Sequence, residues 1–190
     1  FVGGRLRFLD MTTVVRDDAV IPPDVDINDI EEERRIVAIG PVFNLDLTDG
    51  SLNPRSGTTV NGQWLFAVPG LGSDNAYDKA NFTVNHFVDV NDKTVVAFRG
   101  SLCAASTDAP FFDLCLFGSS SNLRGYSSGQ YRDRASWAVQ TEWRRHLGGR
   151  FGVVAFAGIG GVAPGLGSIG HSTLLPAAGG GVRYEVSSEY

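Results

Sequence analysis

Apolar and polar residues alternate along most of this chain with a period of two, which is typical of β-strands whose two faces meet different surroundings. The clearest case is the segment 77–90, where Phe82 and Val84 alternate with Asn81 and Thr83. Helical periodicity is almost absent, and only Asp29 to Arg35 is expected to form a helical turn or two. The pattern predicts about eight strands, at 2–15, 35–47, 58–68, 77–90, 93–104, 135–147, 150–159 and 174–187.

The predicted strands and their connections have lengths that point to a membrane. Strands of roughly ten to fourteen residues exceed the five or six that are common in soluble sheets, and about ten residues allow a tilted strand to cross a bilayer. Alternation of short turns with long loops is typical of transmembrane barrels, with the turns on the periplasmic side and the loops outside. The shorter connections are 48–57, 91–92 and 147–150, and the mostly longer ones are 17–34, 70–76, 105–134 and 160–172.

The two faces of the predicted strands carry different kinds of residue. The polar face mixes small residues with Asn, Gln, Arg and Glu, as expected of a wall that lines a water-filled lumen. On the apolar face, Trp137 and Trp143 lie near opposite ends of the strand predicted at 135–147, where the aromatic girdles of membrane barrels occur. These features predict an all-β fold, an antiparallel transmembrane β-barrel rather than a soluble β-sandwich.

The charge and the candidate catalytic residues exclude some classes of function but do not identify one. The formal net charge is −5 and no basic run is present, which argues against a nucleic-acid partner. Cys103 and Cys115 are too few for a disulfide framework or a metal site, and a single bridge and two free thiols both stay open. No Gly-x-Ser-x-Gly, His-Glu-x-x-His or phosphate-binding motif occurs, so we expect neither enzymatic activity nor a cofactor or metal.

One motif in the longest predicted loop carries a resemblance to a known family. Leu123-Arg124-Gly125-Tyr126, continued by 129–134, resembles the Val/Leu-Arg-Gly-Phe/Tyr motif of the bacterial surface-antigen superfamily of outer-membrane barrels. That group includes the assembly factors BamA and TamA and is related to the two-partner secretion transporters. Similar motifs follow in the family's order over nearly the whole chain, at 46–57, 108–118, 140–144, 154–160 and 179–185.

The resemblance implies both an architecture and a function. It implies that residues 1–190 are part of one outer-membrane barrel domain of about sixteen strands, with the loop at about 105–134 folding inward. We therefore expect a fragment that cannot close alone. The implied function is to assist insertion of outer-membrane proteins or translocation of a partner. The implied partners are outer-membrane lipid, nascent outer-membrane or secreted proteins, and periplasmic domains upstream in the same chain.

Two alternatives to this function stay open. The first is a passive pore, or a barrel that anchors a fused domain in the membrane. The second is a soluble all-β binding domain. Conductance in bilayers would favour the pore, and solubility without detergent would favour the binding domain.

The candidate site is the loop motif and the lumen wall that it would meet. In the family, an aspartate facing the lumen helps to hold the loop arginine, but Gly158 stands at that position here. Glu142, on the lumen face of the strand at 135–147, could bind the guanidinium of Arg124 instead. The less favoured interpretation is that Arg124 is an exposed loop arginine. The proposed loop-anchoring residues are Leu123, Arg124, Gly125 and Tyr126, and their proposed lumen partners are Glu142, Phe156, Gly158 and Arg183.

Overall fold

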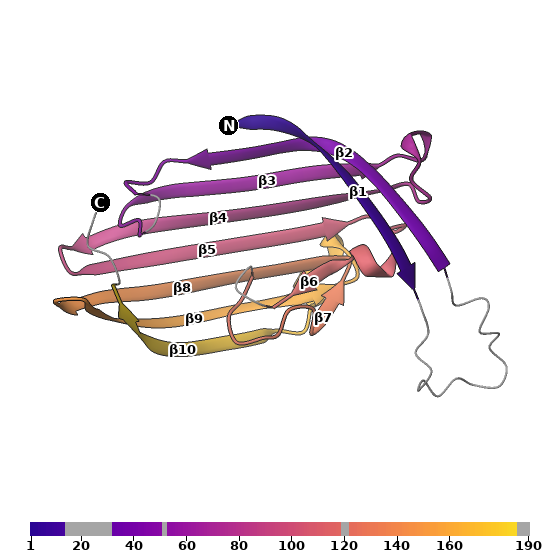
Figure 1. The fold of residues 1–190 in the computed structure, drawn as a ribbon. Coiled ribbons are helices and arrows are strands. Elements are labelled where there is room, and N and C mark those ends of the chain that lie inside the picture. Colours follow the sequence, from indigo (N-terminus) through magenta and orange to yellow (C-terminus); the bar gives the residue numbers. More distant parts are fainter. Residues whose placement is uncertain (14–31, 51–52, 119–121, 186–190) are drawn as a thin grey trace.

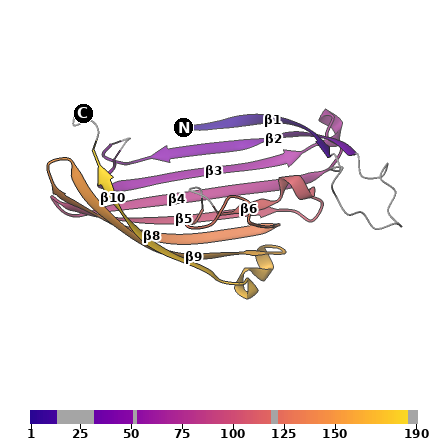
Figure 2. The ribbon, with the colours of Figure 1, turned by 60° about the horizontal axis from the view of Figure 1, so that its bottom comes forward.

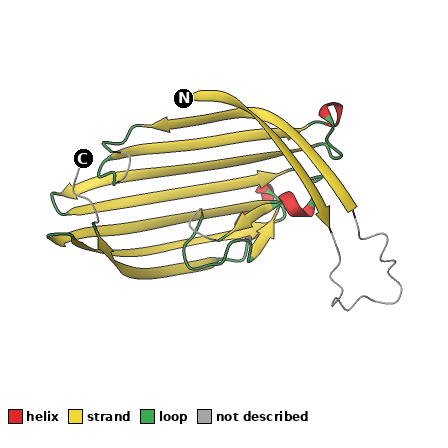
Figure 3. Cartoon of the chain, in the orientation of Figure 1, coloured by secondary structure: helices red, strands yellow, loops and turns green. Residues whose placement is uncertain are grey.

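The computed structural model describes residues 1–13, 32–50, 53–118 and 122–185, and most of them belong to one antiparallel sheet (Figures 1 and 3). The prediction of an all-β fold with eight long strands is confirmed. The strands follow one another in the order β1-β2-β3-β4-β5-β8-β9-β10. Their bounds are β1 (Val2–Thr13), β2 (Glu32–Asp46), β3 (Gly57–Ala67), β4 (Tyr77–Asn91), β5 (Thr94–Ala105), β8 (Ala135–Gly148), β9 (Phe151–Ala163) and β10 (Leu175–Tyr184).

Small elements lie at one end of the sheet, where the longer connections are. Between β5 and β8 the chain forms a short second sheet from β6 (Cys115–Phe117) and β7 (Tyr131–Asp133). In the described residues, three short 3-10 helices lie in the loops: η2 (Pro69–Leu71), η3 (Phe111–Asp113) and η4 (Leu166–His171). None of the helices in the described part of the chain is long and apolar enough to cross a membrane.

The long sheet is curved, and the segment that carries β6 and β7 lies over its concave face (Figure 2). Strands β1 and β10 form the two edges, so the described residues do not close the sheet into a cylinder. At the loop end, β1 and β2 bend away from the direction of the other strands (Figure 1). The loop between β5 and β8 therefore lies against the wall rather than extending away from it.

The two faces of the sheet differ as the alternating pattern predicts. The ladder places Val84, Gly100 and Val139 side by side on the convex face, while Thr83, Ser101 and Ala138 form a row on the concave face. Large apolar side chains on the convex face remain exposed to the surroundings; they include Ile39, Leu45, Trp64, Phe82, Phe98, Val139 and Trp143. The buried apolar residues instead gather where the loops cover the sheet.

Two expectations about local structure are wrong. Residues 32–35 belong to β2 rather than to a helical turn, because Arg34 and Arg35 pair with Met11 and Asp10 of β1. The Gly-rich loop expected at 160–172 begins only after Ala163, because Gly160 and Gly161 continue the β9 ladder. Tertiary pairing overrides local propensity in both places.

Smaller differences concern the boundaries of strands and a loop that lies mostly outside the described residues. The turn between β4 and β5 is Asp92-Lys93, one residue later than the expected Asn91-Asp92, because Asn91 still pairs with Thr94. The acidic loop expected at 17–34 lies outside the described residues up to position 31. The open question about the two cysteines has an answer, since Cys103 and Cys115 form a disulfide. This bridge ties β5 to β6.

Candidate functional site: the loop seated on the concave face

The loop motif lies over a wall built by neighbouring positions of β8 and β9. Register pairs Gln140 with Gly158 and Glu142 with Phe156, so all four residues face the concave side, as the alternation predicts. Phe156 pairs in turn with Gly179 of β10, where a Cβ atom would stand 2.8 Å from the Phe156 ring. The aromatic ring therefore occupies the space that a side chain at Gly179 would take.

Leu123 occupies the space that a side chain at Gly158 would take. Leu123 is fully buried, and a Cβ atom at Gly158 would stand 2.6 Å from Leu123 Cδ1 and 2.7 Å from the carbonyl oxygen of Val139. Gly160 leaves similar room for Phe117, whose Cε2 atom would be 2.6 Å from an added Cβ. All three of these distances from an added Cβ atom are shorter than an ordinary van der Waals contact. The absence of the expected acid at Gly158 thus leaves the space that the side chain of Leu123 fills.

Arg124 forms an ion pair with Glu142 through Nη1 and Oε2. The other carboxylate oxygen of Glu142 accepts a hydrogen bond from Nε of Arg144, two residues further along β8. The Arg124 guanidinium also lies 5.3 Å from the centre of the Phe156 ring. Glu142 is buried, but the Arg124 side chain is 44% exposed, so the pair stabilises the seated loop by only about 1 kcal/mol.

Backbone hydrogen bonds, a glycine turn and aromatic packing also hold the loop motif on the concave face. The amide N–H of Arg124 donates to Oε1 of Gln140 at 3.4 Å. Gly125 has φ of +99°, a conformation that favours glycine, and a Cβ atom there would lie 3.8 Å from Cβ of Ala177. The Tyr126 hydroxyl donates to the carbonyl oxygen of Pro176 at 2.6 Å, and its ring packs against Phe117.

Arg183 is the one proposed partner that does not meet the loop motif. Its guanidinium donates to Oδ1 of Asn53 at 3.2 Å, beside the turn between β2 and β3. The structure therefore brings together Leu123, Arg124, Gly125, Tyr126, Glu142, Phe156 and Gly158, and leaves Arg183 at the end of the sheet that carries the short turns.

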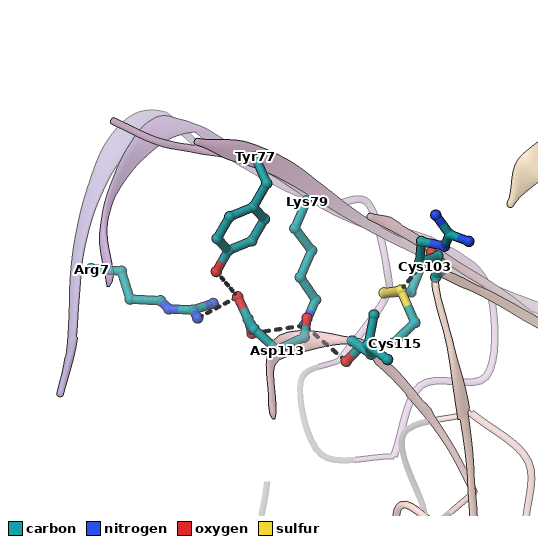
Figure 4. Close-up of polar contacts among 8 residues, drawn as sticks. Arg7, Tyr77, Lys79, Cys103, Asp113 and Cys115 are labelled. Atoms are coloured by element: carbon teal, nitrogen blue, oxygen red, sulfur yellow. Dashed lines mark hydrogen bonds and ion pairs between the residues drawn. A yellow bond between two sulfur atoms is a disulfide. The ribbon is translucent and has the colours of Figure 1, made fainter. Parts of the chain in front are cut away.

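A second anchor of the loop, which the sequence analysis did not identify, centres on Asp113 (Figure 4). This carboxylate is 7% exposed and accepts hydrogen bonds from Arg7 Nη2 at 2.6 Å, from Lys79 Nζ at 3.0 Å and from the Tyr77 hydroxyl. Lys79 also donates to the carbonyl oxygens of Asp113 at 2.9 Å and Leu114 at 3.3 Å. The cluster joins η3 to β1 and β4.

The charge state of Asp113 follows from its partners. Burial alone would raise the pKa of this carboxyl group. The hydrogen bond from Tyr77 and the positive charges of Lys79 and Arg7 outweigh burial, so that the pKa lies below its ordinary value. Asp113 therefore stays ionised at neutral pH and holds both cations. The disulfide lies two residues further along the chain, so a covalent and an ionic anchor fix the same end of the loop.

No sequence signal pointed to this cluster because its members are far apart in the chain. Arg7, Tyr77 and Lys79 lie 106, 36 and 34 residues from Asp113. The alternation of the strand at 77–90 places Lys79 on the same face as Asn81 and Thr83, but it does not identify a partner for Lys79. Within the described ranges, no group of three or more His, Cys, Asp or Glu side chains could hold a metal ion.

Comparison with known proteins agrees with this fold. A model of the Omp85 superfamily domain matches residues 23–168. The fold is similar to the crystal structure of BamA from Haemophilus ducreyi lacking POTRA domains 1–3, with a TM-score of 0.70 and 16% sequence identity. The match covers 88% of this chain and 39% of that chain, so this chain spans about two fifths of the length of that protein. No curated protein matches the sequence.

Proposed function

The chain belongs to the Omp85 superfamily, and from this membership we propose that it is barrel wall from an outer-membrane protein that inserts or translocates other proteins. Residues 1–190 form part of one barrel domain, and the loop at about 105–134 is its inward-folding element. The partners are outer-membrane lipid on the convex face and nascent outer-membrane or secreted proteins. Periplasmic domains upstream in the same chain would deliver those proteins. The barrel itself is proposed to act without enzymatic chemistry.

The convex face supports the membrane location over the alternative of a soluble binding domain. Its strands are 10 to 15 residues long, enough to cross a bilayer when tilted. Trp64 is 50% and Val139 49% exposed on this face, although both would normally be covered in a water-soluble protein. Lipid chains would cover this surface without any further protein contact.

The seated loop is the observation that carries the proposal. Leu123 lies against Gly158, and Arg124 meets Glu142, so the loop occupies the concave side that would become the lumen. A loop held in this position obstructs a wide passive channel. It also links the loop end of β5 and β8 to the inner wall of β9 and β10, so that movement of either strand pair is coupled to the loop. Such coupling suits a barrel whose wall must rearrange around a client protein.

Replacement of Arg124 by alanine tests the role of the loop. We expect Arg124→Ala to leave the full-length protein inserted in the membrane, to increase cleavage of the loop by proteinase K about fivefold, and to lower client insertion into proteoliposomes by a similar factor. The expected fivefold change follows from the loss of one half-exposed ion pair, which is worth about 1 kcal/mol. Arg124→Lys should recover part of the loss, because the charge remains without the planar guanidinium.

Arg132→Ala is the matched control in the same loop. Arg132 lies over the Phe111 ring at 4.6 Å and has no contact with Glu142. The proposed role of the loop fails if Arg124→Ala inserts clients as well as Arg132→Ala and the unchanged protein do. Ion conductance without any client insertion, in every variant, would instead identify a passive pore.

A further inference from the structure

A basic cavity lies at the opposite end of the sheet from the loop, beside the short turns. It has a volume of about 260 Å³ and lies among the ends of β5, β8, β9 and β10 and the turn between β2 and β3. Of the described residues that line it, only Glu185 carries a carboxylate. Its basic lining residues, apart from His146, are Arg55, Lys93, Arg144, Arg145, Arg150 and Arg183.

Only part of this positive charge is neutralised by the protein. Arg55 binds both oxygens of Asp89 at 2.9 Å, and Arg144 shares Glu142 with the loop arginine. Lys93, Arg150 and Arg183 form no ion pair with a carboxylate of the described residues. Within the described residues, the side chain of Arg183 donates a hydrogen bond to the neutral amide oxygen of Asn53. The cavity therefore keeps an excess of positive charge that an anion would stabilise.

Two of the cavity's arginines, Arg144 and Arg183, lie on the concave side of the sheet rather than on the lipid face. Register pairs Arg144 with Val154, and Arg183 with Gly152, in the same alternation that places Glu142 and Phe156 on the concave wall. Gly152 carries no side chain, which leaves room between β8 and the Arg183 side chain. Guanidinium groups in such a position bind carboxylates through paired N–H donors. A lipid headgroup would have to leave the membrane to reach them.

We propose that this cavity binds the carboxylate side chains of an acidic polypeptide segment that approaches the barrel from the side of the short turns. This inference rests on the proposed function, because it names the chemistry by which a client chain is first held. The positive cavity attracts the segment, and the ion pairs are weak enough individually to release it. Further along the concave face, neutral amide side chains such as Asn61 and Asn81 carry no charge that would compete with the cavity for the acidic segment.

Peptide binding to the full-length protein in neutral detergent tests the proposal. The probe is a fluorescein-labelled peptide of alternating Glu and Gly, followed by fluorescence anisotropy, and the control peptide has Gln in place of Glu. We expect the Glu peptide to bind and the Gln peptide not to bind. The double variant Arg150→Gln/Arg183→Gln should weaken binding roughly tenfold, as expected for the loss of two partly exposed ion pairs.

Arg35→Gln is the matched control, because Arg35 is an exposed arginine at the loop end of the sheet, paired with Asp10 at 3.6 Å. It should bind the Glu peptide as the unchanged protein does. Equal binding of the Gln peptide, or undiminished binding by the double variant, would overturn the proposal. So would tighter, cavity-dependent binding of inorganic phosphate or of phosphatidylglycerol vesicles, which would identify a phosphate site.

The outcome is separable from that of the proposed function. Arg124→Ala should bind the Glu peptide normally, because Arg124 is not among the residues that line the cavity. Peptide binding that needs Arg150 and Arg183, together with client insertion that ignores Arg124, would reject the loop's role and keep the cavity. Client insertion that needs Arg124, together with peptide binding that does not need Arg150 and Arg183, would reject only the proposed binding of acidic segments in the cavity.

Discussion

Replacement of Asp113 by asparagine should release the first part of the loop from the wall. The amide keeps the shape of the side chain but leaves Arg7 and Lys79 without their shared carboxylate in a largely buried site. Loss of one partner from a buried ion pair costs about 3–5 kcal/mol, and the partial exposure of the two cations reduces this to about 2–3 kcal/mol. The fraction of loop that opens should rise roughly 30- to 150-fold. Hydrogen exchange of the amides of 109–117 in the full-length protein measures this change.

Asp108→Asn is the control for this substitution, since Asp108 is an exposed aspartate of the same loop. It should change exchange by less than about twofold, as surface substitutions usually do. Exchange in Asp113→Asn that equals exchange in Asp108→Asn would show that the ionic cluster does not hold the loop.

The same carboxylate predicts a dependence on pH. The pKa of Asp113 is lowered in the folded protein, so its contribution to stability is fully present above the unfolded pKa of about 4 and is lost as the pH falls through the lower folded value. Acidification from pH 7 to about 3 should therefore loosen the loop of the unchanged protein. The loop of Asp113→Asn should be loose at both pH values, and this difference assigns the titration to Asp113.

Replacement of Gly158 by aspartate should loosen the loop, although the change supplies the acid that the family resemblance leads us to expect at this position. Even the Cβ atom would stand 2.6 Å from Leu123 and 2.7 Å from a backbone oxygen, and at most the leucine side chain can move away. Overpacking of this kind costs about 1–3 kcal/mol, and displacement of Leu123 adds the loss of its burial. We expect cleavage of the loop by proteinase K to rise about tenfold or more.

Two further variants separate the causes. Gly158→Ala adds only a methyl group and should produce most of the effect. Gly100→Ala adds the same group to β5 at a position with no other atom within 4 Å, and should leave the loop protected. A loop that becomes more protected in Gly158→Asp would mean that the acid binds Arg124 and that the leucine seat is unimportant.

Much of the wall could be predicted from the order of residues because each strand satisfies a simple local rule. The strand at 77–90 alternates without interruption, and the structure forms β4 there. The placement of Glu142 and Phe156 on one face follows from the same period. The motif at 123–126 pointed to the right loop. Its role in holding that loop stays a prediction.

The remainder depends on contacts that no local pattern contains. Gly160 seemed to end a strand, but the close approach of Phe117 requires a glycine there within a continuous ladder. The short strands β6 and β7 exist because Cys115 pairs with Asp133 across the loop. The period of two places Arg144 on the same face as Glu142, but it does not predict that Arg144 is the second cation bound to this carboxylate. In each case, the contact is between segments that come close together only in the folded protein.

A disulfide between the loop motif and β10 tests most directly whether the loop is seated inside the barrel in the membrane. A Cβ atom at Gly125 would lie 3.8 Å from Cβ of Ala177, which is the usual separation in a disulfide. Gly125→Cys/Ala177→Cys in outer-membrane vesicles should therefore form a bond, detected by mass spectrometry of the linked peptides. Gly125→Cys/Ala157→Cys, with Ala157 on the convex face, should form none. Free, alkylatable thiols at 125 and 177 in the folded protein would contradict the seated loop.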